Sequence, residues 1–268
     1  MTGGAAGQDP VFCTVEDGVA WIRLNRPAAG NTVDLPLANG LLQAAIRCDQ
    51  DASIRCVVLT GEGKLFCGGG DLAAMNAAGE GVAGFLSELA GVLHMAVARL
   101  MRMPKPLVVL VNGPAAGAGF SLAIAGDVVL AARGAHFTAA YGAVGLSPDG
   151  GLSWTLPRLV GLRKAQDIIL RNPRIAAAEA EAIGLVTRVV DEGELETEGR
   201  ALAASLADGP TGALGRARAL LIESFGAPLE AQLEREVRSL AASGATAECR
   251  EGVAAFLARR KPDFRGVN

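Results

Sequence analysis

The sequence predicts an α/β fold with parallel strands, followed by a helical C-terminal portion. Three apolar runs rich in β-branched residues have the character of buried strands: 54–60 (IRCVVLT), 106–112 (PLVVLVN) and 127–132 (DVVLAA). A glycine-rich or helix-like segment follows each run, and this alternation favours parallel strands. After about Gly150 the pattern is helical only, with helices expected over 163–170, 194–206, 212–225, 229–243 and 247–260.

The other elements follow in chain order. Residues 1–9 have neither a basic nor an apolar leader pattern and are predicted to form a disordered lead. Segments 11–16 and 19–24 meet at Asp17-Gly18, which is typical of a hairpin. Apolar residues recur at helical spacing over 86–103 and stop before Pro104. Because no linker interrupts the chain, we expect one domain over 10–268, with an α/β core over 10–200 and a helical portion over 201–268.

Composition argues against several classes of function. The formal net charge of −3 does not favour a nucleic-acid partner. The five cysteines form no CxxC pair and the two histidines have no ligand spacing, so neither a metal site nor a disulfide framework is expected. The apolar stretch 106–132 contains Pro114 and Asp127, so we expect no membrane span there. Without a secretory pattern, the expected location is cytoplasmic.

The segment around residue 120 comes near to two known motifs and matches neither. A dinucleotide fingerprint that begins at Gly117 requires Gly or Ala where this chain has Leu122. A hydrolase nucleophile elbow around Ser121 lacks its final glycine, and His136 is the only histidine after the serine.

Two glycine-rich turns of similar design each link a predicted strand to a predicted helix. The first, GEGKLFCGGGDL over 61–72, ends near Asp71, a good helix N-cap, and the second is NGPAAGAGFSLAIAGD over 112–127. Residues without bulk leave peptide N–H groups accessible where a helix begins. The two turns could supply the two donors of an oxyanion hole, or they could only permit tight turns and close packing.

These turns belong to an ordered set of motifs spread over nearly the whole chain: VAWIRLNRP, IRCVVLTGEGKLFCGGGDL, PKPLVVLVNGPAAGAGFSLAIAGDVVLAA, GLSPDGGLSWTLPRLVG, AEAIGLV and AAFLARRKPDFRG. With this set the sequence resembles the crotonase (enoyl-CoA hydratase/isomerase) family. The resemblance implies the ClpP/crotonase spiral of ββα units and an acyl-CoA thioester as the partner. It also implies homotrimers or hexamers, and no cofactor beyond the coenzyme A that the substrate carries.

The resemblance assigns binding roles by position. The oxyanion-hole N–H groups fall on Gly70 and Ala118. The coenzyme A part would meet main-chain groups of Leu65, Phe66, Cys67 and Gly68 and a basic residue near the C-terminus, Arg260 or Lys261. Those two basic residues could equally be a solvated helix end. A lysine often seen after the family's NRP motif is Ala29 in this chain, which leaves the phosphate contacts open.

The same comparison bears on the chemistry. Hydratases of this family use two glutamates, and the matching positions here hold Ser121 and Tyr141. Asp149, in SPDGG, matches an acidic position of family isomerases, and one base with an oxyanion hole suffices for a 1,3 proton shift. The sequence therefore favours an enoyl-CoA isomerase with Asp149 as the base. Asp149 could instead be a turn residue that caps a helix over 150–159.

Two further functions stay open: a hydratase or other thioester enzyme that uses different residues, and an acyl-CoA-binding protein without activity. Met75, Phe85, Leu89 and Trp154 could line an acyl pocket or belong to the core. Cys67 is expected to be a small buried thiol, and His94 and His136 to be packed or surface residues.

Overall fold

The structure is a computed structural model that describes residues 9–267. Residues 1–8 of the predicted disordered lead lie outside the described residues. The main sheet has six strands in this spatial order: β1 (Val11–Glu16), β2 (Val19–Leu24), β3 (Cys56–Gly61), β4 (Leu107–Val111), β6 (Val128–Ala132) and β9 (Arg188–Val190). All neighbours in it are parallel except β1 and β2. The predicted α/β architecture and its three central parallel strands are confirmed.

The predicted hairpin is formed by β1 and β2, which pair antiparallel from Val11 opposite Leu24 to Glu16 opposite Val19. Its turn residues, Asp17 and Gly18, have φ of 48° and 76°. Two successive residues with positive φ are typical of the tight turn that matches the twist of a hairpin. An aspartate followed by a glycine adopts this backbone at little cost.

The prediction that only helices follow Gly150 is wrong. Strand β9 closes one edge of the main sheet, and β8 (Ile175–Ala176) joins β5 (Ala115–Ala116) and β7 (His136–Thr138) in a second sheet of three strands, in the order β5, β7, β8. These strands are two or three residues long. Such short strands show no alternation in sequence, because alternation needs several residues to become visible.

Ten α-helices and four short 3-10 turns lie within the described residues. The helices are α1 (Leu35–Gln50), α2 (Leu72–Ala77), α3 (Val82–Arg102), α4 (Ala118–Ala123), α5 (Leu152–Arg171), α6 (Ala177–Ala182), α7 (Leu195–Ala207), α8 (Thr211–Ser224), α9 (Leu229–Gly244) and α10 (Ala247–Leu257). The 3-10 turns are η1 (Pro27–Ala29), η2 (Gly79–Gly81), η3 (Tyr141–Val144) and η4 (Glu192–Glu194). The segments predicted over 150–159 and 163–170 both correspond to parts of α5, where the non-helical backbone of Gly161 (φ 77°, ψ 155°) separates two helical parts.

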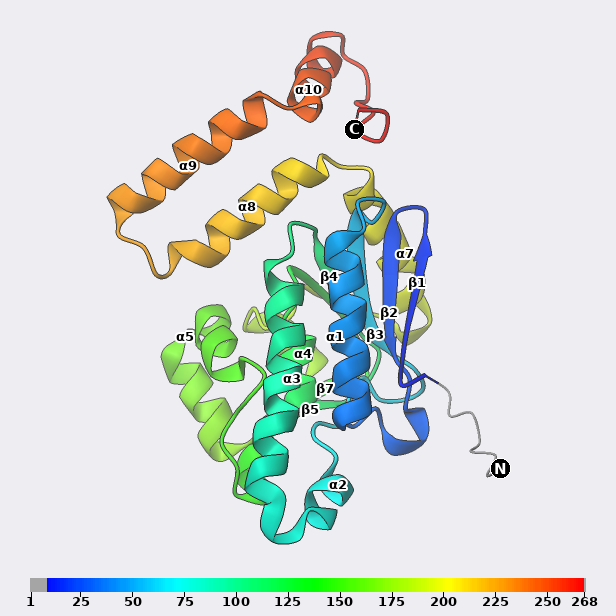
Figure 1. Cartoon of the computed structure of the whole chain (residues 1–268), viewed down its shortest axis with the longest axis vertical. Helices are drawn as coiled ribbons and strands as arrows, with labels where there is room; N and C mark the ends of the chain where they lie inside the picture. The colour runs from blue at the N-terminus through cyan, green and yellow to red at the C-terminus, as the bar shows by residue number, and fades with distance from the viewer. Residues whose placement is uncertain (1–8, 268) are drawn as a thin grey trace.

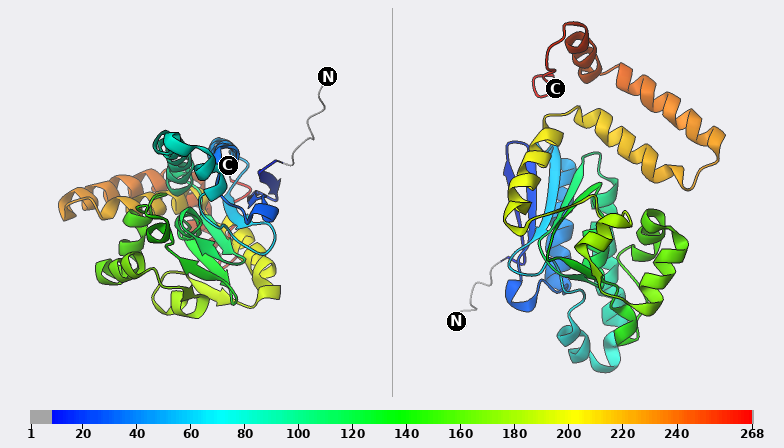
Figure 2. Two further views of the ribbon diagram at one scale, coloured as in Figure 1. Left: turned by 90° about the horizontal axis from the view of Figure 1, so that it is seen from below. Right: turned by 180° about the vertical axis from the view of Figure 1, so that it is seen from behind.

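Helices cover both faces of the main sheet. Helices α1 and α3 lie side by side on one face and α7 lies on the other (Figures 1 and 2). Alternate residues of β3 separate two hydrophobic clusters: Val57 and Leu59 face the larger cluster with α1 and α3, whereas Cys56 and Val58 face the cluster with α7. A strand buried on both faces is continuously apolar, which explains the runs in the sequence.

The helical C-terminal portion extends away from the core as an arm formed by α8, α9 and α10 (Figures 1 and 2). One attachment of the arm to the core is Arg218 of α8, which is 7% exposed. Its guanidinium donates hydrogen bonds to Asp127 (2.6 Å), to the carbonyl oxygen of Met103 (2.6 Å) and to that of Leu100 (2.9 Å). Helix α9, by contrast, has no buried residue within this single chain as described.

One helical stretch among the described residues, Gly79–Arg102, is long and apolar enough to cross a membrane. A helix in the core of a globular protein can meet the same two criteria. Here the buried residues of α3, among them Leu89, Leu93 and Leu100, belong to the larger hydrophobic cluster together with α1. A single helix of this kind is therefore weak evidence for a membrane span.

Candidate active site

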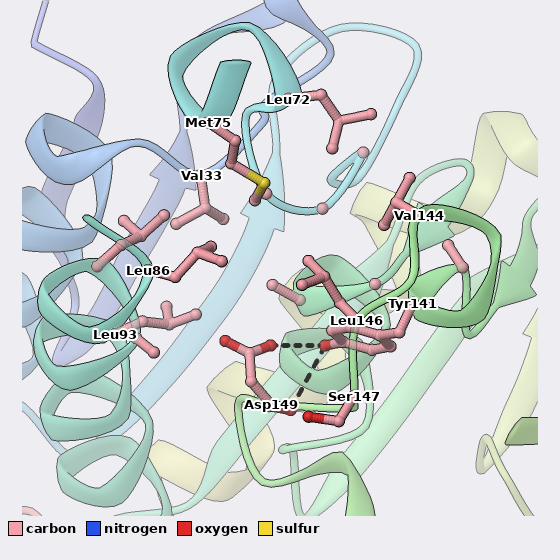
Figure 3. Close-up of a pocket in the computed structure, with 18 residues that line it drawn as sticks. Val33, Leu72, Met75, Leu86, Leu93, Tyr141, Val144, Leu146, Ser147 and Asp149 are labelled. Carbon is pink, nitrogen blue, oxygen red and sulfur yellow. Dashed lines mark hydrogen bonds between the residues drawn. The ribbon is translucent and has the colours of Figure 1, made fainter. Parts of the chain in front are cut away.

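A mostly apolar cavity of about 260 Å³ lies between the two glycine-rich turns, α2, α3 and the loop that follows η3 (Figure 3). We call it the first cavity. Its apolar lining includes Val33, Leu72, Met75, Leu86, Leu89, Leu93, Val144 and Leu146. Of the predicted pocket residues, Met75 and Leu89 thus line this cavity. Its polar groups are the backbone of both turns and the side chains of Tyr141, Ser147 and Asp149.

The two glycine-rich turns lie side by side. The N–H groups of Phe66 and Cys67 donate to the carbonyl oxygen of Pro114 (3.1 and 3.3 Å), and the N–H of Ala116 donates to that of Cys67 (3.0 Å). The contact is close enough that a Cβ at Gly119 would lie 2.2 Å from the carbonyl oxygen of Cys67. Only a glycine fits at that position without moving one turn away from the other.

Both N–H groups predicted for the oxyanion hole border the first cavity, because Gly70 and Ala118 are lining residues. Across residues 9–267, neither N–H donates a hydrogen bond to another protein atom. The carbonyl oxygen of Gly69 and the N–H of Asp71 form hydrogen bonds with the backbone of Val33, and the N–H of Gly70 between them forms none. Ala118 is buried and Gly70 is partly buried, and two unpaired N–H donors beside one cavity are suited to an anionic oxygen.

The first turn is held by polar side chains that the sequence analysis did not single out. The buried Asn31 amide donates to the carbonyl oxygens of Glu62 (2.9 Å) and Leu65 (2.8 Å). Asp71 caps α2 by accepting from the N–H groups of Ala73 and Ala74, both at 3.1 Å. The hydrogen bond from Ala74 and the nearby Arg26 guanidinium lower the pKa of Asp71, in spite of partial burial.

Asp149 forms the polar end of the first cavity together with Tyr141. The Tyr141 hydroxyl donates to Oδ1 of Asp149 at 2.7 Å, and Figure 3 shows the other carboxylate oxygen on the side of α3. Ser121 is buried behind them, where its hydroxyl donates to the backbone oxygen of Asp149 (2.9 Å) and lies 3.2 Å from the Tyr141 oxygen. Three of the predicted site residues are thus brought together, although Ser121 is not among the described residues that line the cavity.

Two side chains near the turns stay protonated at neutral pH. Burial, followed by the negative charge of Asp149, raises the pKa of Tyr141 above its ordinary value, so its phenol is neutral and acts as a donor. Burial raises the pKa of Cys67 to about 12, and its thiol donates to the backbone oxygen of Asn31 at 3.0 Å. Cys67 is therefore a packed thiol rather than a thiolate.

His94, predicted to be a packed or surface residue, lies beside Asp149, a contact that the sequence did not indicate. Its Nε2 accepts a hydrogen bond from the N–H of Gly150 (3.0 Å) and lies 3.8 Å from Oδ2 of Asp149. His94 belongs to α3, 55 positions before Asp149, and is half exposed. Its place in the helical pattern gave no signal of this contact, because the path of the loop that carries Asp149 decides it.

A second cavity of about 420 Å³ adjoins Asp149 on the side of His94. Trp154 lines this second cavity and not the first, with the Arg158 guanidinium stacked over its ring at 4.0 Å. Asp149 is the one described residue that lines both cavities.

The other predicted binding residues have different surroundings. Of the segment 65–68, Gly68 lines the first cavity, whereas Phe66 and Cys67 are fully buried. Arg260 is exposed and forms a two-pronged ion pair with Glu251 (2.6 and 2.8 Å), and Lys261 is exposed beside it. Figure 1 shows α10 at the opposite end of the molecule from α2. Within one chain, the structure does not bring Arg260 and Lys261 to the first cavity.

Within the described part of the chain, no group of three or more His, Cys, Asp or Glu side chains could hold a metal ion. The polar groups at the site include two free N–H groups, one carboxylate, one neutral phenol, the Ser147 hydroxyl and one imidazole. Such a set can polarise a carbonyl oxygen and transfer a proton.

Comparison with known proteins identifies the family of this chain. A family model described as enoyl-CoA hydratase/isomerase matches residues 14–267. A solved enoyl-CoA hydratase from Polaromonas superposes with a TM-score of 0.90 at 33% identity, over 94% of this chain and 98% of that one. The family match and the shared fold thus define a crotonase-type acyl-CoA enzyme.

Two relatives have names that state a particular substrate and reaction. The 1,2-epoxyphenylacetyl-CoA isomerase of Escherichia coli is 38% identical over 96% of this chain and 98% of its own length. The 4-chlorobenzoyl coenzyme A dehalogenase-2 of an Arthrobacter species is 34% identical over 91% of this chain and 88% of its own. The chain belongs to the enoyl-CoA hydratase/isomerase family.

Proposed function

We propose that the protein is an enoyl-CoA isomerase that moves a double bond from C3 to C2 of an acyl-CoA thioester. One observation carries the proposal: among the described residues that line the first cavity, Asp149 is the only one with a carboxyl side chain. The same lining has no histidine, lysine or arginine. Asp149 is therefore the residue of this lining that we propose as the base that removes a proton from carbon.

The proposed reaction uses the three groups in turn. The N–H groups of Gly70 and Ala118 bind the thioester oxygen and stabilise the negative charge that develops on it. Asp149 takes a proton from C2, the electron pair of that C–H bond moves towards the thioester oxygen, and a dienolate forms. The proton then returns at C4, and the double bond lies between C2 and C3. No cofactor takes part beyond the coenzyme A of the substrate.

Hydration is the less favoured chemistry at this site. Addition of water across a double bond by this family uses two acidic groups, and the matching positions hold Ser121 and Tyr141. Tyr141 has a raised pKa and already donates to Asp149, so it does not replace a glutamate as a base.

We also propose that copies of the chain associate through the arm, as trimers or hexamers, in the cytoplasm. Large apolar side chains of the arm are exposed in the single chain: Leu221, Phe225, Leu229, Leu233, Val237, Leu240, Phe256 and Leu257. Four of them repeat along one face of α9, which suits packing against another helix. In such an assembly Arg260 or Lys261 of a neighbouring copy would be available to coenzyme A phosphates.

The test uses two substrates and one signal, the absorbance of the conjugated thioester. An isomerase generates this absorbance from a 3-enoyl-CoA, and a hydratase removes it from a 2-enoyl-CoA. A protein that only binds acyl-CoA changes neither, although it shows saturable binding in calorimetry. We expect the first result, and loss of the 2-enoyl signal without any gain from the 3-enoyl substrate would contradict the proposal.

A further inference from the structure

Asp149 stands in the wall between two cavities that differ in character. The first cavity is mostly apolar and holds the free N–H groups of Gly70 and Ala118. The second is lined in part by His94, Arg102 and Trp154. His94 lines the second cavity only. A proton that the Asp149 carboxylate takes up in the first cavity can therefore be reached from the second cavity.

The two carboxylate oxygens of Asp149 have different partners. Oδ1 accepts the hydrogen bond from the Tyr141 hydroxyl at 2.7 Å. Oδ2 accepts no hydrogen bond from any residue that the structure describes, and it lies 3.8 Å from Nε2 of His94. The oxygen whose lone pairs are free to take a proton is thus the one beside the histidine.

The His94 ring is oriented to pass a proton on. Since the N–H of Gly150 donates to Nε2 at 3.0 Å, Nε2 holds a lone pair and the proton of the neutral ring is on Nδ1. The side chain is half exposed. A proton received at Nε2 can therefore be matched by loss of the Nδ1 proton to water. For this step His94 Nε2 must give up the hydrogen bond from the Gly150 N–H and form one with Oδ2 of Asp149. Nε2 and Oδ2 must come about 1 Å closer to reach hydrogen-bond length.

The other neighbours of Asp149 offer no such route. Tyr141 is 8% exposed and Ser121 is 3% exposed, so neither is in contact with bulk water. Burial and the charge of Asp149 raise the pKa of Tyr141, which keeps its proton in place. The Asp149 side chain is itself 30% exposed, and of the three polar side chains beside it, His94 has by far the largest exposed fraction, 49%.

We infer that His94 is a positioning and relay residue that exchanges the proton held by Asp149 with solvent in the second cavity. The inference rests on the proposed isomerase function. The C–H bond at C2 breaks, the O–H bond at Oδ2 forms, and the proton then moves from Oδ2 to Nε2 while Nδ1 releases one to water. The reverse sequence returns a solvent proton to Oδ2 before it is delivered to C4. The step is a proton exchange with no oxidation or reduction.

The experiment measures solvent label in the product. The whole protein converts a 3-enoyl-CoA in D2O, and mass spectrometry of the first product formed gives the fraction that carries deuterium at C4. We compare the wild type with His94→Gln, because a glutamine oxygen can still accept from Gly150 but cannot relay a proton. The matched control is His136→Gln, since the other histidine of the chain lines neither of the two cavities.

We expect deuterium in most wild-type product and in His136→Gln product, and a drop of about twofold or more in the deuterium content of the product that His94→Gln forms. The label is counted per product molecule, so partial unfolding of a variant does not change it. Equal label in His94→Gln would overturn the inference, because water would then reach Asp149 directly. Wild-type product without deuterium, or a His94→Gln protein that makes no product, would overturn it as well. Absence of any wild-type product refutes the proposed function instead, and the relay with it.

Discussion

The hydroxyl of Tyr141 donates a hydrogen bond of 2.7 Å to Oδ1 of Asp149 inside the first cavity (Figure 3). This contact fixes one oxygen of the carboxylate and leaves the other towards α3. A hydrogen bond to a charged acceptor is stronger and more directional than one between neutral groups. Tyr141 therefore orients the group that we propose to be the base.

Tyr141→Phe should lower kcat for isomerisation by about tenfold, the rate equivalent of about 1.4 kcal/mol, while KM changes little. The reason is that the phenylalanine ring fills the same space but no longer holds Oδ1. Steady-state kinetics with a 3-enoyl-CoA provide the measurement. Ser121→Ala should lower kcat less, because the Ser121 hydroxyl contacts Tyr141 and donates to the backbone of Asp149 but not to its carboxylate. An unchanged kcat in Tyr141→Phe would show that the orientation of Asp149 does not depend on this bond.

Asp149→Asn should reduce isomerisation by about 10² to 10⁴-fold and leave acyl-CoA affinity nearly unchanged. An amide has the shape of a carboxylate but cannot accept the C2 proton. Turnover and calorimetric binding are measured on the same preparation. The control is Asp167→Asn, because Asp167 pairs with Arg171 within α5 and lines neither cavity. Wild-type turnover in Asp149→Asn would remove this residue from the mechanism.

Gly119→Ala and Gly91→Ala should have opposite effects on stability. At Gly119 an added Cβ would lie 2.2 Å from the carbonyl oxygen of Cys67, which should cost about 1–3 kcal/mol and separate the two turns. Gly91 lies exposed within α3 with open space around it, where alanine should stabilise by about 0.5–1 kcal/mol. Denaturant unfolding and turnover give both effects. A Gly119→Ala protein with wild-type stability would contradict the close contact between the turns.

The lowered pKa of Asp71 predicts how stability depends on acid. A carboxyl group whose pKa is lower in the folded state than the unfolded value of about 3.9 stabilises the fold above that pH, and its contribution is lost as the pH falls through the folded pKa. Asp71→Asn keeps a helix-capping side chain but loses the charge beside Arg26. We expect the wild type to be more stable than Asp71→Asn at pH 7, and the difference to shrink towards pH 3. A difference that is constant with pH in urea unfolding would argue against a charge effect.

Leu240→Glu should weaken association of the chain without unfolding it. The Leu240 side chain is 76% exposed in the single chain, so a charge there adds little strain to one copy but disfavours burial against another. Light scattering after size-exclusion chromatography measures the mass. Ala231→Glu adds the same charge on another face of α9 and should leave the mass unchanged. A wild-type mass for Leu240→Glu would exclude this face of α9 from the interface.

Much of the fold could be predicted from sequence because its signals are local. Asp17-Gly18 marks a turn by its backbone preference, and strands such as β3 and β4 are continuously apolar because they are buried on both faces. Strands β8 and β9 escaped prediction because two or three residues carry no periodic pattern.

Part of the candidate site could also be predicted from sequence, and part could not. The sequence placed Gly70, Ala118 and Asp149 among the candidate residues, and all three line one cavity. His94 could not be found, since its approach to Asp149 depends on how α3 is rotated and on how the loop before α5 returns to it. Trp154 was expected in the acyl pocket as one of two possibilities, and it lies in the second cavity beyond Asp149.

The three directed hydrogen bonds of Arg218 have a consequence for geometry. Their acceptors lie at the end of α3 and just before β6. If α8 shifted or rotated against the core, the buried Arg218 guanidinium would lose these partners. The angle at which the arm leaves the core is therefore set within a single polypeptide, before any encounter. In a complex built on α9, that angle would set the rotation between neighbouring copies and therefore the symmetry of the assembly.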